Sequence, residues 1–141
     1  MCRFPADEAT MKTVMVFGTF DILHLGHLNL FKQAKCLGDK LIVVVARDCN
    51  VEKIKVQKPI HNEKERLEFL RHIDLVDVVI LGDKVDIYKV IEKVKPDVIA
   101  LGYDQVVDKK RLKDWKIERL RPYKPTKAKS NKIKKYIEKI I

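Results

Sequence analysis

The chain has 141 residues and a formal net charge of +10, and this length fits one domain with a proper core. No apolar run is long enough to span a membrane, and the first residues lack the apolar core of a signal peptide. The three cysteines form no Cys-x-x-Cys pair, which argues against a zinc site. We therefore expect a cytoplasmic protein with no membrane partner and no metal held by its own side chains.

The two ends differ in composition from the rest of the chain. Residues 1–10 show no periodicity and precede Met11, so we interpret them as a disordered leader or an expression remnant and place one domain over residues 11–141. Residues 121–141 hold eight Lys or Arg and one acid, a net charge of +7. Such a tail binds nucleic acid, steers anionic nucleotides into a site, or is simply a solvated face.

Predicted strands and helices alternate along the domain. Apolar, β-branched runs predict strands over 14–17, 40–47, 76–81, 97–101 and 117–120. Helical spacing, with capping residues at Asn62, Asp86 and Ser130, predicts helices over 26–38, 62–73, 86–94, 108–116 and 130–141. This alternation favours a parallel sheet with helices on both faces, so we expect an α/β fold built on a Rossmann-like, doubly wound, five-stranded sheet.

The stretch 48–61 has little periodicity and no obvious apolar anchor. It carries three lysines, Lys53, Lys55 and Lys58, before Pro59. A long irregular stretch in a compact α/β domain is usually functional or disordered. We therefore predict a mobile lid that orders over a bound phosphate chain.

The turn between the first strand and the first helix, residues 18–27 (GTFDILHLGH), carries the most chemical information. Open α/β sheets bind ligands at the carboxyl ends of their strands, and a helix start offers unpaired N–H groups and a positive dipole end. His24 and His27 lie at this anion-attracting end, and Gly18 and Gly26 let a ligand approach the backbone closely. The turn predicts a phosphate site.

The string Gly-Thr-Phe-Asp-x-x-His-x-Gly-His resembles the signature of the cytidylyltransferase-like nucleotidyltransferases. The flanking strand and helix supply the context that such a motif requires. The resemblance extends over nearly the whole chain from Thr13 onward. It implies the strand order 3-2-1-4-5, with the signature strand at the centre, and a homodimer.

The same resemblance implies roles for residues of the turn. His24 and His27 match the two histidines that contact the triphosphate and stabilise the transition state. Thr19 and Phe20 occupy the positions where the turn faces the phosphates. Asp21 is expected to orient the turn rather than to take part in catalysis.

Two basic positions follow from the resemblance as well. Lys55 lies near the loop lysine that approaches the α- and β-phosphates, with Lys53 and Lys58 as alternatives. Arg66 matches the arginine that follows this loop, and the alternative is an ion pair with Glu63 on the same helix.

The remaining implied nucleotide ligands lie in the second half of the chain. Asp104, in the segment Gly102-Tyr103-Asp104, matches an aspartate beside the base and ribose. Arg121 and Ser130 correspond to a segment that closes on the phosphates, although the family's Gly and Thr residues are absent here.

Within this family, the segments 43–48, 80–82 and 101–105 resemble the archaeal FAD synthases, which are FMN adenylyltransferases. The implied substrates are ATP and FMN, with Mg²⁺ or another divalent cation on the triphosphate, and no nucleic acid is expected as a partner. The alternatives are a CTP-dependent glycerol-3-phosphate cytidylyltransferase and a non-catalytic RNA- or nucleotide-binding module. A phosphate nucleophile is largely ionised at neutral pH and needs no general base, which fits a sequence without a defensible catalytic triad.

Overall fold

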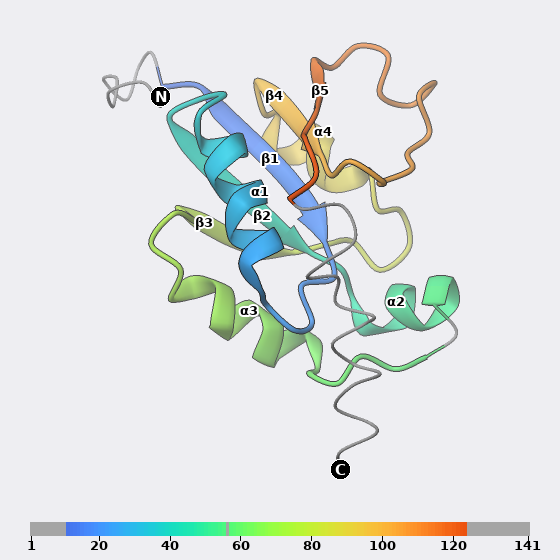
Figure 1. Cartoon of the computed structure of the whole chain (residues 1–141). Coiled ribbons are helices and arrows are strands. Elements are labelled where there is room, and N and C mark those ends of the chain that lie inside the picture. Colours follow the sequence, from blue (N-terminus) through green and yellow to red (C-terminus); the bar gives the residue numbers. More distant parts are fainter. Residues whose placement is uncertain (1–10, 56, 124–141) are drawn as a thin grey trace.

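The computed structural model describes residues 11–55 and 57–123, and it contains a five-stranded sheet (Figure 1). All strand pairs are parallel and the strand order is β3-β2-β1-β4-β5. The strands are β1 (Thr13–Gly18), β2 (Lys40–Val45), β3 (Val78–Leu81), β4 (Val98–Leu101) and β5 (Ile117–Arg119). The predicted fold class, strand number and strand order are confirmed.

Helices cover both faces of the sheet. The described helices are α1 (Leu25–Lys35), α2 (Asp48–Lys55), α3 (Glu63–Arg71) and α4 (Lys89–Val94). Figure 1 shows α1 and α3 on one face, α4 on the other, and α2 beyond the edge where β1 and β2 end. None of the helices in the described ranges is long and apolar enough to cross a membrane.

Alternate residues of each central strand face opposite layers of the core. In β1, Val14 and Val16 belong to the cluster beneath α1 and α3, whereas Met15 packs with the cluster beneath α4. Ile42 and Val44 of β2 also belong to the second cluster. The continuous apolar runs seen in the sequence thus reflect strands that are buried on both faces.

Three local predictions were wrong. Residues 48–55 form α2 instead of an irregular lid, because Val51, which is only 3% exposed, anchors the segment to the core. Residues 108–116 form turns rather than a helix. The fourth helix begins at Lys89 and has no side-chain cap, since Asp86 accepts from the N–H of Tyr88 in the turn before it.

The capping box predicted for α3 is confirmed. The side chain of Asn62 accepts from the N–H of Glu65 at 2.9 Å, and Glu65 accepts in return from the N–H of Asn62 at 3.1 Å. The predicted leader, residues 1–10, and the helix predicted over 130–141 lie outside the described residues.

Candidate functional site

A cavity of about 590 Å³ opens at the carboxyl edge of the sheet. Segments that follow all five strands line it, as expected for the switch point of a doubly wound sheet. Ten of the predicted site residues lie on its wall: Gly18, Thr19, Phe20, His24, Gly26, His27, Gly102, Tyr103, Asp104 and Arg121. Their roles stay predictions, but the fold brings them to one place.

The two histidines form the N-terminal cap of α1. His24 is the N-cap residue, and its Nδ1 accepts from the N–H of Gly26 at 3.1 Å. His27, three residues on, accepts with Nδ1 from the N–H of His24 at 3.3 Å, which completes a reciprocal capping box. The two rings lie 4.1 Å apart between centroids. The cap therefore fixes the position of both imidazoles at the helix start.

This cap also defines the tautomer of each ring. A neutral imidazole has one N–H donor and one acceptor nitrogen. Because Nδ1 of both His24 and His27 accepts from the backbone, each neutral ring carries its hydrogen on Nε2. In the neutral form, both rings therefore carry an Nε2–H donor at the helix start, in the wall of the cavity.

Burial lowers the pKa of His24 from its ordinary value. Desolvation disfavours the charged imidazolium, and protonation would place a hydrogen on the Nδ1 that now accepts from Gly26. His24 is therefore neutral near pH 7. It acts as a hydrogen-bond donor and not as a fixed positive charge.

Gly18 lines the cavity and also leaves space for an aromatic ring, and the predicted close approach of a ligand to its backbone stays a prediction. A Cβ at Gly18 would lie 2.6 Å from the ring of Phe20. Phe20 is buried, has a positive φ of 52°, and packs edge-on against His27 with ring centroids 5.5 Å apart. The ring of Phe20 thus supports the ring of His27. The positive φ of Phe20 strains the backbone and shapes the turn.

Arg66 lies behind the cavity wall and is fully buried. Its guanidinium donates to the carbonyl of Thr19 at 2.8 Å, to the carbonyl of His61 at 3.1 Å and to Oδ1 of Asp48 at 2.7 Å. The side chain does not form part of the cavity wall. In this structure Arg66 ties the turn after β1, residues 18–27, to α2 and α3. Glu63, the alternative partner expected for Arg66, forms an ion pair with Arg47 instead.

Asp21 orients the turn from the other side. Its carboxylate is buried and accepts from the N–H groups of Ile60 at 2.7 Å and His61 at 2.8 Å. These bonds hold the segment before α3 against the turn, as expected for an orienting group. Asp21 and Arg66 therefore both hold the turn after β1 against the segment that precedes α3.

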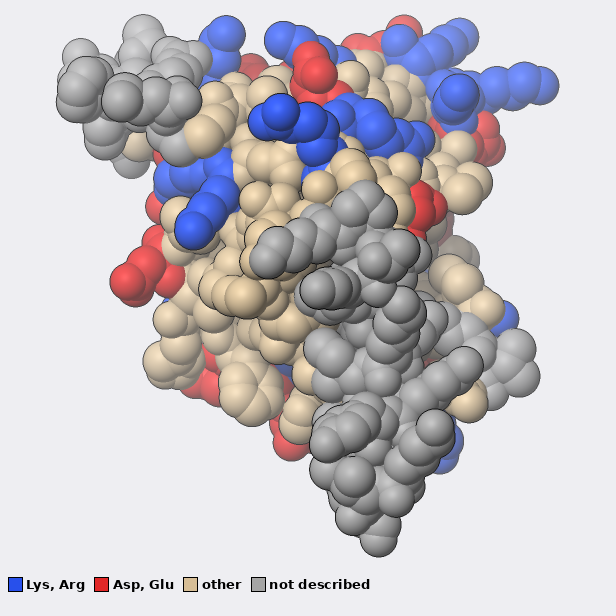
Figure 2. Space-filling model, in the orientation of Figure 1, with Lys and Arg blue, Asp and Glu red and all other residues tan. Residues whose placement is uncertain are grey.

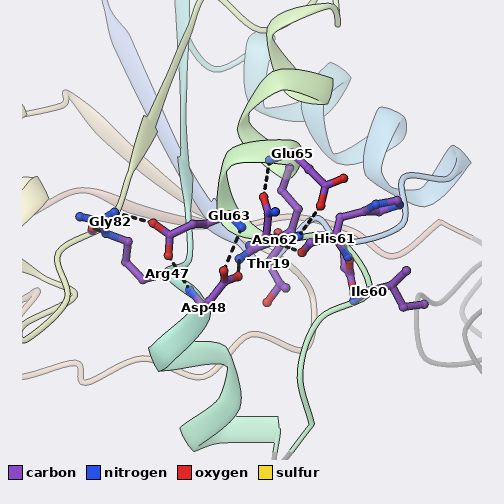
Figure 3. A network of polar contacts seen from close by, with 11 residues as sticks. Thr19, Arg47, Asp48, Ile60, His61, Asn62, Glu63, Glu65 and Gly82 are labelled. Atoms are coloured by element: carbon purple, nitrogen blue, oxygen red, sulfur yellow. Dashed lines mark hydrogen bonds and ion pairs between the residues drawn. The ribbon is translucent and has the colours of Figure 1, made fainter.

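Arg47 joins the ends of two neighbouring strands. Its Nε donates to the carbonyl of Gly82 at 2.9 Å, and its Nη1 pairs with Glu63 at 2.6 Å. Glu63 also accepts from the N–H of Asp48, and these bonds to Arg47 and to the Asp48 N–H lower its pKa despite an opposing desolvation effect. Figure 3 shows how this polar network connects β2, α2, α3 and the loop after β3.

On the opposite side of β1, two glutamines fix the wall. Gln105 accepts from the N–H of Gly102 and donates to the carbonyl of Phe17. Gln33 of α1 donates to the carbonyl of Arg121 at 2.8 Å and accepts from its N–H at 2.9 Å. The segments that carry Asp104 and Arg121 are thereby tied to β1 and α1.

Besides Arg66, two predicted residues, Lys55 and Ser130, are not part of the described cavity wall. Lys55 ends α2, and its side chain lies outside the described part of the structure, as does Ser130. The alternatives Lys53 and Lys58 are exposed and do not line the cavity. Within the described residues, no group of three or more His, Cys, Asp or Glu could hold a metal ion.

Comparison with known proteins identifies the family. The family model described as "Cytidylyltransferase-like" matches residues 15–137. The chain belongs to the cytidylyltransferase-like family. It is 51% identical over 104 residues to the "FAD synthase" of Ferroglobus placidus, covering 74% of this chain and 67% of that protein. It is 47% identical over 137 residues to the "FAD synthase" of Pyrococcus abyssi, covering 90% of this chain and 93% of that protein.

A solved structure has the same fold. The lipopolysaccharide core biosynthesis protein from Thermoplasma volcanium superposes with a TM-score of 0.74 and is 43% identical in sequence. The match covers 80% of this chain and 98% of that one.

Sequence reasoning missed several wall residues beyond the family signature. They are Arg47, Asn50, Ile54, Gly82, Asp83, Ile87, Gln105 and Val106. All follow the carboxyl ends of β2, β3 or β4. The strand-order rule for ligand sites would have pointed to these segments, but periodicity does not tell which side chains turn inward.

Proposed function

We propose that the chain transfers the AMP group of ATP to FMN and releases FAD and diphosphate. The observation that carries this proposal is the histidine-capped start of α1 in the wall of a cavity, in a chain similar to FAD synthases. A phosphate oxygen of FMN attacks the α-phosphorus of ATP and forms a new P–O bond. The bond to the bridging oxygen breaks, and diphosphate leaves with its electron pair.

Catalysis in such a reaction consists of alignment and charge stabilisation. The FMN phosphate is already ionised at neutral pH, so no side chain has to remove a proton. His24 and His27 are proposed to donate from Nε2 to phosphoryl oxygens, where negative charge accumulates. The positive end of the α1 dipole adds to this stabilisation, whereas the N–H groups of Gly26, His27 and Leu28 already donate to His24 within the cap.

A divalent cation such as Mg²⁺ is proposed to arrive with ATP as part of the substrate. The described residues offer no protein cage for it. Mg²⁺ usually keeps several waters and binds substrate phosphates in sites of this kind. Its expected work is to neutralise phosphate charge during the displacement.

We assign the remaining contacts from the resemblance. Asp104, in the turn after β4, is proposed to contact the ribose of ATP, and Arg121 the phosphates. Lys55 and Ser130 remain proposed phosphate ligands. Thr19 is proposed to face the phosphates through the turn that Arg66 holds, which makes Arg66 a positioning residue.

The alternatives fit less well. Similarity to FAD synthases does not favour a CTP-dependent glycerol-3-phosphate cytidylyltransferase. An RNA-binding module would use the basic tail, residues 121–141, and the part of this tail after Tyr123 lies outside the described residues. Figure 2 shows Lys and Arg side chains gathered over the upper part of the view. The exposed basic residues of segment 109–116 do not line the cavity, and we interpret them as a solvated face.

A homodimer and a cytoplasmic location are proposed from the resemblance alone. Sedimentation equilibrium of the purified chain tests the first, since a dimer has twice the mass of a 16.5 kDa monomer. The activity itself is tested by incubating the protein with ATP, FMN and Mg²⁺ and separating FAD by chromatography. FAD and diphosphate in equal amounts support the proposal, whereas diphosphate without FAD contradicts it.

A further inference from the structure

Two connections that line the cavity start from strands that are not neighbours in the sheet. The β3–α4 connection, residues 82–88, and the β4–β5 connection, residues 102–116, are separated by β2 and β1. Ile87 of the first and Val106 of the second belong to the cavity wall. The strand pairing joins neither connection directly to the other. The width of the cavity therefore depends on contacts outside the sheet as well as on the strands.

Arg111 of the β4–β5 connection makes such a contact with Asp86 of the β3–α4 connection. Its Nη1 donates to Oδ1 of Asp86 at 2.8 Å, and its Nη2 donates to Oδ2 at 2.7 Å. This bidentate arrangement is the strong and directional form of an arginine–carboxylate pair. The hydrogen bonds from Arg111 lower the pKa of Asp86, so this carboxylate is charged at neutral pH. Neither residue lines the cavity.

Tyr88 adds further contacts between the same two connections. The guanidinium of Arg111 lies over the Tyr88 ring, with its Cζ 4.8 Å from the ring centroid. The Tyr88 hydroxyl accepts from the N–H of Asp108 at 2.9 Å. We call Asp86, Tyr88 and Arg111 the clasp. Because Asp86 and Tyr88 flank Ile87 in the chain, the clasp acts on the segment that reaches the cavity wall.

The segments that carry the clasp are both anchored in the core beneath α4. Leu112, next to Arg111, is only 2% exposed, and it belongs to the same buried cluster as Val90 of α4. These anchors hold each segment to the sheet, whereas the clasp holds the two segments to each other. A partly exposed ion pair contributes little to global stability. The main effect of the clasp is therefore on the relative position of the two connections.

We propose that Asp86 and Arg111 are positioning residues that fix the distance between the two walls of the cavity. The inference rests on the proposed function, in which two substrates must meet in line at one phosphorus. Small errors in the alignment of reacting groups lower the rate steeply. Without the clasp, each substrate still binds to its own part of the wall, but the reacting atoms are less well aligned.

Steady-state kinetics on variants of the pair tests this role. Arg111→Met removes the charge and both hydrogen bonds, and it should lower the kcat for FAD formation by about tenfold. The KM values for ATP and FMN should change by less than about twofold, since no substrate contact is lost. Asp86→Asn keeps an oxygen for the N–H of Tyr88 and should lower kcat similarly. Arg111→Lys keeps the charge without the planar fork, so its kcat should be intermediate.

A double variant and a matched control separate the pair from unrelated effects. Because either single change breaks the same contact, Asp86→Asn combined with Arg111→Met should be no slower than Arg111→Met alone. Lys113→Met removes an exposed positive charge from the same connection, outside the cavity wall, and should keep the wild-type kcat. The urea unfolding midpoint of each variant should stay close to that of the wild type.

Trp115 allows a measurement that needs no turnover. It is the single tryptophan of the chain, it lies on the same connection as Arg111, and it packs against the core cluster beneath α4. Acrylamide should quench its fluorescence more strongly in Arg111→Met than in the wild type or Lys113→Met. The reason is that a segment with fewer tertiary contacts opens more often.

Three results would overturn the inference. The first is a wild-type kcat in Arg111→Met, and the second is equal quenching of Trp115 in Arg111→Met and the wild type. The third is a KM for one substrate that rises as much as kcat falls, since the pair would then belong to the binding site of that substrate. The proposed function fails separately, if the wild-type protein forms no FAD from ATP and FMN.

Discussion

The side-chain amide of Gln33 pairs with the backbone of Arg121 as a neighbouring strand would. Its Nε2 donates to the carbonyl at 2.8 Å and its Oε1 accepts from the N–H at 2.9 Å. Gln33 lies on α1, two turns after the histidine cap. One helix thus presents both imidazoles and holds the segment that brings Arg121 to the cavity.

Gln33→Ala should therefore raise the KM for ATP by about tenfold, the effect of losing two modest hydrogen bonds. Gln33→Glu keeps the acceptor and loses the donor, so it should have an intermediate effect. Initial rates at varied ATP measure both. In an Arg121→Ala background the same Gln33→Ala change should have little further effect. Full additivity of the two changes would show that Gln33 does not act through Arg121.

The two ring nitrogens of His24 have separate roles. Nδ1 caps α1, and Nε2 is the proposed donor to a phosphoryl oxygen. His24→Asn keeps an oxygen that accepts from the N–H of Gly26 but lacks the Nε2 donor. It should retain the stability of the fold and lower kcat by about 10²-fold, the scale for removing one aimed donor. His24→Ala should lower kcat similarly and also cost about 1 kcal/mol of stability through the lost cap. Urea unfolding and kcat measurements on both variants check this, and equal stability of the two variants would contradict the capping role.

The lowered pKa of His24 has a consequence for stability. The folded protein binds this proton less readily than the unfolded chain, whose His has a pKa of about 6.5. The contribution of His24 to the free energy of unfolding is therefore fully present above about pH 6.5. It is lost as the pH falls from there through the pKa of His24 in the folded protein. Urea unfolding from pH 8 to pH 5 measures this loss. His24→Asn should show a smaller acid-side loss, and an identical profile would contradict the assignment.

Arg66 should matter for stability as well as for activity. Arg66→Met removes three hydrogen bonds from a fully buried guanidinium and should destabilise the fold by about 3 kcal/mol. Arg71→Met, at an exposed position on the same helix, serves as the matched control and should change stability by less than about 0.5 kcal/mol. Equal unfolding midpoints for the two variants would mean that Arg66 does not support the turn.

Much of the fold follows from local sequence signals. The β-branched runs at 40–45 and 98–101 and the capping box at Asn62 identify their elements because these patterns lie within a few neighbouring residues. The helix at 48–55 was missed because its one deep anchor, Val51, gives no periodic pattern. Long-range partners are also invisible in a single sequence. Nothing near Arg66 shows that it would bond the carbonyl of Thr19, 47 residues away.

The part of the site that lies within one continuous segment could be predicted from the sequence. The ten-residue signature places His24 and His27 on the cavity wall without any tertiary information. The wall beyond the signature needs the strand order, because Asn50 and Asp83 lie 33 residues apart in the chain and are brought into contact by the pairing of β2 with β3. The sequence also does not show that Gly18 leaves space for the ring of Phe20, because this contact depends on the positive φ of Phe20.

The most direct test of the proposed function is a set of four matched reactions with the purified chain. Diphosphate release is measured with ATP and with CTP, each in the presence of FMN or of glycerol 3-phosphate, and the organic product is identified by mass. The account predicts diphosphate and FAD in equal amounts from ATP and FMN, with much slower release in the other three combinations. Release that is fastest with CTP and glycerol 3-phosphate, or no FAD from ATP and FMN, would contradict it.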